Sequence, residues 1–106
     1  MIRINVKPMS INEAFKGRRY KTKTYTEYEK KLLLILPKVV IPSGRIKLTL
    51  VFGITKVADI DNPTKALLDI FQKKYGFDDK NIYELHIKKV PVKTGFEFFE
   101  YYFEPC

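Results

Sequence analysis

The sequence predicts a single α+β domain spanning residues 1–106, in which a mixed sheet of about four strands packs against two helices. Three observations predict this fold. Apolar and polar residues alternate in several short runs, as in half-buried strands. Two segments between these runs have helical spacing with caps or stops at their ends. A chain of 106 residues with 45% hydrophobic residues can build one core but not two.

The first half of the chain predicts a strand, a loop and a helix. Ile2, Ile4 and Val6 alternate with polar residues, so a strand is expected at residues 1–6. Residues 7–23 contain turn-forming and basic residues and predict an irregular loop. Thr24 and Glu27 have the spacing of a capping box, which predicts a helix from there to about residue 36, before Pro37. Its expected apolar face consists of Tyr28, Leu32, Ile35 and Leu36.

The second half predicts a strand, a helix and two more strands. Residues 45–53 alternate strictly, with Ile46, Leu48, Leu50 and Phe52 on one side. Asp61 or Asn62 is expected to cap the next helix, with Pro63 at its first helical position and Gly76 after its end. Residues 81–90 and 96–103 predict two strands, which we expect to form a hairpin through residues 91–95.

The charge of the chain favours a polyanionic partner. Twenty Lys and Arg against twelve Asp and Glu leave a net charge of +8, which is typical of proteins that bind nucleic acid. A solubilising surface is the alternative. The basic residues expected to contact nucleic acid are Lys16, Arg18, Arg19, Lys21, Lys23 and Lys56.

This chain lacks the residues that are characteristic of several other classes of protein. Cys106 is the single cysteine, so no intrachain disulfide is possible and a reducing cytoplasm is expected. No apolar run approaches the length of a membrane span, and no membrane association is expected. With His86 as the single histidine and no glycine-rich nucleotide motif, neither a zinc site nor a small organic cofactor is expected.

Acidic residues are concentrated around the second predicted helix. Asp59 and Asp61 are two residues apart, so in an extended segment their carboxylates project from one side and can hold a divalent cation. Asp61, Lys65 and Asp69 recur at four-residue intervals on one helical stripe. Asp78 and Asp79 follow the helix. Taken singly, these residues can also be explained as caps, ion-pair partners and a polar turn.

The same residues resemble the RusA family of Holliday junction resolvases. The central match is ADIDNPTKALLDIF, followed by GFDDKNIYELHIKKVPVKTG, and KPMSINEAF resembles the family's N-terminal pattern. The resemblance implies that Asp59, Asp61 and Asp79 bind the metal and that Lys65 assists catalysis, with Asp78 as a further candidate. It also implies Mg²⁺ as cofactor, with Mn²⁺ able to substitute, and a homodimer that cuts symmetric strands of a four-way junction. Family members often carry arginines before the first Asp, whereas this chain has Lys56 alone.

We therefore expect a metal-dependent endonuclease that cuts branched DNA in recombination and repair. The metal would activate water, and Lys65 would neutralise charge on the scissile phosphate. A non-catalytic basic nucleic-acid-binding module is the main alternative. A phosphatase of the haloacid dehalogenase type shares the Asp-x-Asp pattern, but it needs a longer chain and a later lysine motif. We expect the dimer to cover one face of the C-terminal strand, because its aromatic residues fall on both faces: Phe96, Phe98, Phe99, Tyr101, Tyr102 and Phe103.

Overall fold

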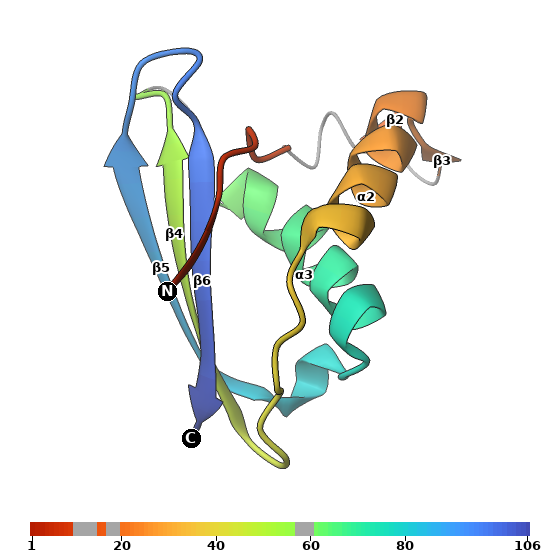
Figure 1. Ribbon diagram of the computed structural model, residues 1–106, viewed down its shortest axis with the longest axis vertical. Helices are drawn as coiled ribbons and strands as arrows, with labels where there is room; N and C mark the ends of the chain where they lie inside the picture. Colours follow the sequence, from red (N-terminus) through yellow and green to blue (C-terminus); the bar gives the residue numbers. More distant parts are fainter. Residues whose placement is uncertain (10–14, 17–19, 57–60) are drawn as a thin grey trace.

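The chain forms a four-stranded mixed sheet with two helices on one face (Figure 1). The computed structural model describes residues 1–9, 15–16, 20–56 and 61–106, and for residues 15–16, 20–21 and 61–62 it describes the backbone alone. The elements are β1 (Ile2–Ile4), β2 (Phe15–Lys16), β3 (Tyr20–Lys21), α2 (Lys23–Ile35), β4 (Ile46–Ile54), α3 (Asp61–Tyr75), the 3-10 turn η1 (Asp79–Asn81), β5 (Ile82–Pro91) and β6 (Phe98–Pro105). The predicted α+β fold is confirmed, and β2 pairs with β3 inside the segment predicted as a loop.

The strands lie across the sheet in the order β1-β6-β4-β5. β5 runs parallel to β4, whereas β6 runs antiparallel to both β4 and β1. The predicted hairpin is therefore wrong, because β4 lies between β5 and β6. Residues 92–97 instead cross the carboxyl end of β4, where the Val92 amide donates to the Ile54 carbonyl oxygen over 2.9 Å. Local periodicity predicts strands but not their neighbours, and β4 needs a partner on each edge to satisfy its backbone groups.

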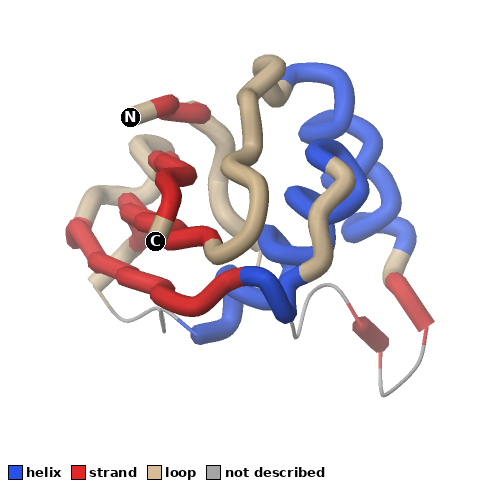
Figure 2. The backbone as a smooth tube through the Cα atoms, turned by 90° about the horizontal axis from the view of Figure 1, so that it is seen from below, coloured by secondary structure: helices blue, strands red, loops and turns tan. Residues whose placement is uncertain are grey.

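The core lies between the sheet and the two helices (Figures 1 and 2). The predicted alternation of β4 is confirmed by its buried residues Ile46, Leu48, Leu50 and Phe52. Opposite them, α3 buries Ala66, Leu67, Ile70 and Phe71. Full burial of one large apolar side chain stabilises the fold by about 1.5–3 kcal/mol. Several such side chains hold α3 firmly against the sheet, and this fixes the positions of its two ends.

The two helices begin close to their predicted positions. α2 starts one residue earlier than expected and is capped by Thr22, whose hydroxyl accepts from the Tyr25 amide over 3.1 Å. The Thr24 and Glu27 capping box is therefore not used, because the helix begins at Lys23 and Thr24 lies inside it. Fully buried Tyr25 is part of the apolar face. Ile35, predicted on that face, is 45% exposed. α3 begins at Asp61, so Asp61 and Asn62 are its first two residues and Pro63 is its third rather than its first. It ends before Gly76, whose φ of 72° is readily adopted by glycine.

Four of the five aromatic residues of β6 are covered within the chain. Phe98, Phe99, Tyr101 and Phe103 are buried, and of the six aromatic residues at this end only Phe96 and Tyr102 are exposed. The rings of Phe71 and Tyr101 lie 4.6 Å apart, and the Tyr75 and Tyr101 hydroxyl oxygens are 2.6 Å apart. The expected uncovered aromatic face is therefore wrong. Helix α3 covers one side of β6, and on the other side the Arg3 guanidinium lies 3.7 Å from the centre of the Phe98 ring.

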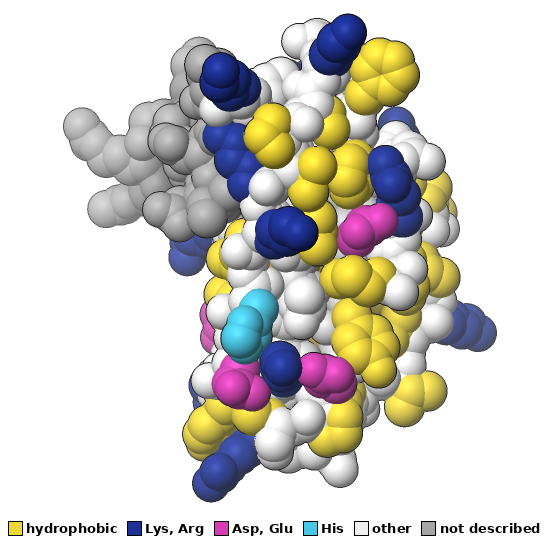
Figure 3. All heavy atoms as spheres, turned by 90° about the vertical axis from the view of Figure 1, so that its left-hand side faces the viewer, with side chains coloured by type: hydrophobic (Ala, Val, Ile, Leu, Met, Phe, Trp, Pro, Cys, Tyr) yellow, Lys and Arg dark blue, Asp and Glu magenta, His cyan; other side chains and the backbone are white. Residues whose placement is uncertain are grey.

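The face of the sheet away from the helices carries both charged and apolar side chains (Figure 3). Lys47 pairs with Glu104 at 3.3 Å, and Arg3 pairs with Glu100 at 3.7 Å, in each case across neighbouring strands. Such cross-strand pairs are common on solvated faces of antiparallel sheets. Neither of the described helices combines the length and the apolar composition that a membrane span requires.

Candidate catalytic and DNA-binding site

One stripe of α3 carries the candidate catalytic lysine. Asp61, Lys65, Leu68 and Gln72 follow one another at three- and four-residue intervals and so share one side of the helix. The Lys65 side chain is exposed, and those of Leu68 and Gln72 are half-buried. Asp69, also predicted on this stripe, is half-buried four residues after Lys65. The pKa of Tyr25 in α2 is raised by burial and by Glu29, and the charge of Asp69 adds to the shift.

The N-terminal end of α3 follows the carboxyl end of a central strand. Asp61 is the first residue of α3, so it lies just after the loop that leaves β4. In parallel β-α-β units, ligands commonly bind outside the carboxyl ends of the strands, where these loops gather. Asp59 lies outside the described residues, and for Asp61 the backbone position alone is described. This end therefore carries Asp61 and, one helical turn later, Lys65.

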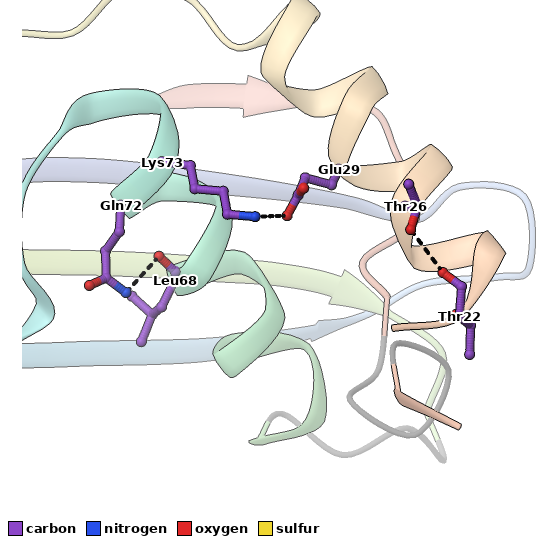
Figure 4. A network of polar contacts seen from close by, with 6 residues as sticks. All are labelled: Thr22, Thr26, Glu29, Leu68, Gln72 and Lys73. Carbon is purple, nitrogen blue, oxygen red and sulfur yellow. Dashed lines mark hydrogen bonds and ion pairs between the residues drawn. The ribbon is translucent and has the colours of Figure 1, made fainter. Parts of the chain in front are cut away.

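Asp78 and Asp79 lie at the other end of the helix. Asp78 caps η1, since its carboxylate accepts from the Lys80 amide over 3.0 Å. The Asp79 amide donates to Gln72 Oε1 over 2.9 Å, while Gln72 Nε2 donates to the Leu68 carbonyl oxygen over 3.3 Å (Figure 4). Gln72 thus ties η1 to the last turns of α3. Both carboxylates are on exposed residues, so they are accessible to a ligand from outside the chain.

The described backbone places two of the predicted metal ligands, Asp61 and Asp79, at opposite ends of α3. Asp61 begins α3, and η1 with Asp79 lies beyond the helix's other end (Figure 1). At 1.5 Å per residue, a 15-residue helix separates its ends by roughly 21 Å. Within the part of the chain that the structure describes, no three His, Cys, Asp or Glu residues are grouped as metal ligands would be. Asp79 therefore does not fit a shared metal site with Asp61 of the same chain.

Contacts with α2 hold α3 in this position. Lys73 Nζ pairs with Glu29 Oε2 at 2.8 Å (Figure 4), and Lys74 Nζ donates to the Leu33 carbonyl oxygen over 2.9 Å. Tyr75 donates its hydroxyl to the Pro37 carbonyl oxygen over 2.8 Å. An exposed ion pair contributes little alone, but together these contacts occupy the α2 side of α3. The Lys65 stripe is left facing outward.

Basic residues gather at the carboxyl ends of β4 and β5. Of the residues predicted to bind nucleic acid, Lys23 and Lys56 are exposed, whereas the side chains of Lys16, Arg18, Arg19 and Lys21 lie outside the described residues. Lys89 Nζ donates to the Lys56 carbonyl oxygen over 2.7 Å, which places the two lysines together. Lys88 and Lys93 are exposed at the same end, where Figure 3 shows several basic side chains.

Lys88, Lys89 and Lys93 were not among the residues predicted to bind nucleic acid. The expected hairpin separated them from Lys56, which is more than thirty residues earlier in the chain. The parallel pairing of β4 with β5 brings them together, because Ile54 lies opposite Pro91 in the register. The strand, helix and strand pattern of residues 45–91 is also typical of a β-α-β unit, and that interpretation would have predicted the three lysines beside Lys56.

Comparison with known proteins agrees with the residues at both ends of α3. Residues 5–95 match the family model described as Endodeoxyribonuclease RusA, which covers both acidic segments, α3 and the lysines of β5. A search of curated proteins finds no match. Because the family model covers most of the 106 residues, the chain belongs to the RusA family of endodeoxyribonucleases, nucleases that bind DNA and resolve Holliday junctions in recombination.

Proposed function

We propose that this protein is a Mg²⁺-dependent, structure-specific endonuclease that resolves four-way DNA junctions by paired, symmetric cuts. The observation that carries the proposal is the family match across α3 and both acidic segments. The net charge of +8 supports a DNA substrate. We further propose a role in DNA recombination and repair, a cytoplasmic location and a homodimeric state. Two equivalent subunits would suit a substrate with two equivalent strands.

Hydrolysis of a phosphodiester requires an aligned water nucleophile and stabilisation of charge on the phosphate oxygens. A divalent cation supplies a more acidic water and neutralises negative charge when it is bound. The proposed ligands are Asp59, Asp61 and Asp79, and carboxylate oxygens are the donors that Mg²⁺ and Mn²⁺ prefer. Of these residues, Asp61 and Asp79 lie at opposite ends of α3.

Lys65 is the proposed catalytic cation. It is exposed one turn after Asp61, on the side of α3 that neither the sheet nor α2 covers. An ammonium group there can contact a phosphate oxygen and offset the charge that develops as the bond breaks. The lysines near the ends of β4 and β5 would hold the DNA backbone. Lys16, Arg18, Arg19, Lys21 and Lys23 are proposed to extend this contact.

The test compares a synthetic four-way junction with a matched linear duplex, in Mg²⁺, in Mn²⁺ and in a chelator. We expect cuts at symmetric positions in the junction with either metal, no cuts with the chelator, and an intact linear duplex. Tight binding without cleavage in either metal would support the non-catalytic module instead. Equal cleavage with the chelator would contradict the metal requirement alone.

A further inference from the structure

Phe96 is an exposed aromatic residue on the loop that joins β5 to β6. Its side chain is 70% exposed, whereas Phe98 and Phe99, the next phenylalanines along the chain, are buried. The loop crosses the end of β4 from which the chain continues to α3, so Phe96 lies at that end of the sheet (Figure 1). Single exposed apolar residues are common on protein surfaces, so exposure alone does not assign a function to this ring.

The backbone of the loop holds Phe96 in a defined turn. The Phe96 amide donates to the Lys93 carbonyl oxygen over 3.0 Å, and Gly95 has a φ of 96°, as the third residue of a type II turn requires. The Gly95 amide in turn donates to Glu97 Oε1 over 2.8 Å. A residue presented on an ordered turn loses little further backbone freedom when it binds a ligand.

Lysines lie beside this turn at the same end of the sheet. Lys93 is the first residue of the turn and is exposed. Lys89 Nζ donates to the carbonyl oxygen of exposed Lys56 over 2.7 Å, where β4 and β5 end. Figure 3 shows basic and hydrophobic side chains together at this end of the molecule. A flat apolar ring beside ammonium groups suits a ligand that offers both aromatic faces and phosphates, which is nucleic acid.

The chemistry of the ring selects one part of the DNA. A phenylalanine side chain has no hydrogen-bond donor or acceptor, so it cannot recognise base edges in a groove by hydrogen bonding. It can stack on the flat face of a base, but neighbouring base pairs cover these faces within a continuous duplex. At the branch point of a four-way junction the stacking of base pairs is interrupted. Unstacking a base there therefore costs less free energy than unstacking one inside a duplex.

We propose that Phe96 stacks on an unstacked base at the branch point and that this contact makes the protein prefer branched to linear DNA. The inference rests on the proposed function and names the part of the substrate that this loop binds. Lys93 would contact phosphates and add affinity for any DNA, because phosphates are present in all of it. Phe96 would add affinity for the branch point alone.

The test measures affinity for a four-way junction and for a linear duplex that contains one of its strands, in a chelator so that neither is cut. The variants are Phe96→Ala, Phe96→Leu, which stays apolar without a flat ring, and Phe96→Trp, which keeps a flat ring. The matched control is Tyr102→Ala, at a 49% exposed aromatic residue in β6. Circular dichroism checks that every variant is folded.

The two DNAs should respond differently. Phe96→Ala and Phe96→Leu should lower junction affinity by about five- to a hundredfold, the range for loss of one stacked base, and leave duplex affinity unchanged. Phe96→Trp and Tyr102→Ala should bind both DNAs as the wild type does. The slope of log affinity against log salt should be unchanged in Phe96→Ala, because no charge is removed. Lys93→Ala should lower that slope by about 1 for both DNAs.

A photocrosslink gives a direct readout of the stacked base. A 5-iodouracil base placed at the branch point crosslinks on illumination to an aromatic ring that stacks on it. Mass spectrometry should locate this crosslink at Phe96. The same base in the middle of a junction arm should give no crosslink at Phe96.

Several results would overturn the inference. These are wild-type junction affinity in Phe96→Ala or Phe96→Leu, and an equal loss of affinity for junction and duplex. A changed sedimentation mass in Phe96→Ala would assign the ring to a subunit contact instead. A wild-type protein that binds junctions but cuts none in Mg²⁺ or Mn²⁺ would contradict the proposed function, while the affinities measured in the chelator still decide the role of Phe96.

Discussion

Single residues at the two ends of α3 are accessible to substitution without disturbance of the core. Asp61 begins the helix, and Asn at this position keeps the size and shape of the side chain while removing its charge. We expect Asp61→Asn to reduce junction cleavage by at least about a hundredfold, as removal of a group essential to transition-state stabilisation does. Junction affinity should stay equal or increase, because a negative charge near phosphate is removed.

The measurement for Asp61→Asn is single-turnover cleavage together with a gel-shift titration of the same junction. Glu84→Gln is the matched control, since Glu84 lies on β5 on the far face of the sheet and contacts Cys106 Sγ at 3.3 Å. It should cut at the wild-type rate. An Asp61→Asn protein that cuts as fast as the wild type would remove Asp61 from the catalytic site.

Gly53 shows a second single-residue constraint, this time on stability. The Phe98 ring lies directly over Gly53 on the neighbouring strand, so a Cβ atom at Gly53 would overlap the ring. We expect Gly53→Ala to lower the free energy of unfolding by about 1–3 kcal/mol through overpacking. Denaturant unfolding measures this change. Adding Phe98→Leu should recover part of the loss, whereas equal effects in both backgrounds would contradict the steric explanation.

At the scale of elements, α3 is attached to β6 by a buried tyrosine pair. Burial raises the pKa of Tyr101, and its hydrogen bond and charge interaction with Tyr75 raise it further. Burial also raises the pKa of Tyr75, against a lowering contribution from the bond to Tyr101. A phenol whose pKa is higher in the folded state stabilises the fold while it is protonated. That stability is present below the unfolded pKa of about 10 and is lost as the pH rises above it.

We therefore expect the free energy of unfolding to be constant from about pH 7 to 9 and to fall above about pH 10. Tyr101→Phe should cost about 1 kcal/mol at neutral pH through the lost hydrogen bond, and should make the alkaline decline shallower. Urea unfolding across this pH range checks both effects. The same alkaline slope in wild type and Tyr101→Phe would exclude Tyr101 as its cause.

The paired ends of β4 and β5 carry a second group of basic residues, Lys56, Lys88, Lys89 and Lys93, of which Lys88 lies on the face of the sheet away from the helices and Lys89 on the helix side. We expect the double variant Lys88→Ala/Lys93→Ala to weaken junction binding and to reduce the slope of log affinity against log salt by about 2. The matched control is Lys31→Ala/Lys38→Ala, which removes the same charge from α2 and the segment after it. If both double variants lower the slope equally, net charge rather than this group of lysines determines binding.

At the scale of the whole molecule, the proposed homodimer has to be tested at a residue other than Tyr101. Fully buried Tyr101 contacts the core, so Tyr101→Asp is expected to unfold the chain rather than release monomers. Leu68→Glu is the better variant, because Leu68 is a half-buried apolar residue on the outward stripe of α3. We expect the wild type to sediment at twice the chain mass and Leu68→Glu to sediment as a monomer that has lost cleavage.

The control for Leu68→Glu is Leu34→Glu, the same substitution at an 84% exposed leucine of α2. It should remain dimeric, and circular dichroism should show that both variants are folded. A dimeric Leu68→Glu protein with wild-type cleavage would place the subunit contact elsewhere.

Local patterns were sufficient to predict the two helices and the four strands of the main sheet, but not β2 and β3. The alternation in β4, the helix with Pro63 in its first turn and the stop at Gly76 depend on neighbours along the chain, and the sequence displays these directly. The acidic segments and Lys65 were likewise identified from residue type and spacing, together with the resemblance to a family. Their catalytic and metal-binding roles remain proposals.

Long-range packing decided the remaining features. β6 pairs with β4 rather than β5, so its buried residues Phe99, Tyr101 and Phe103 pack against Phe71 of α3. The rigid length of α3 places Asp61 and Asp79 apart, although the sequence suggested one cluster. Periodicity records which side of an element is apolar, but not which element covers it or how far apart its ends lie in space. Those depend on contacts between residues that are distant along the chain, and tertiary structure alone determines them.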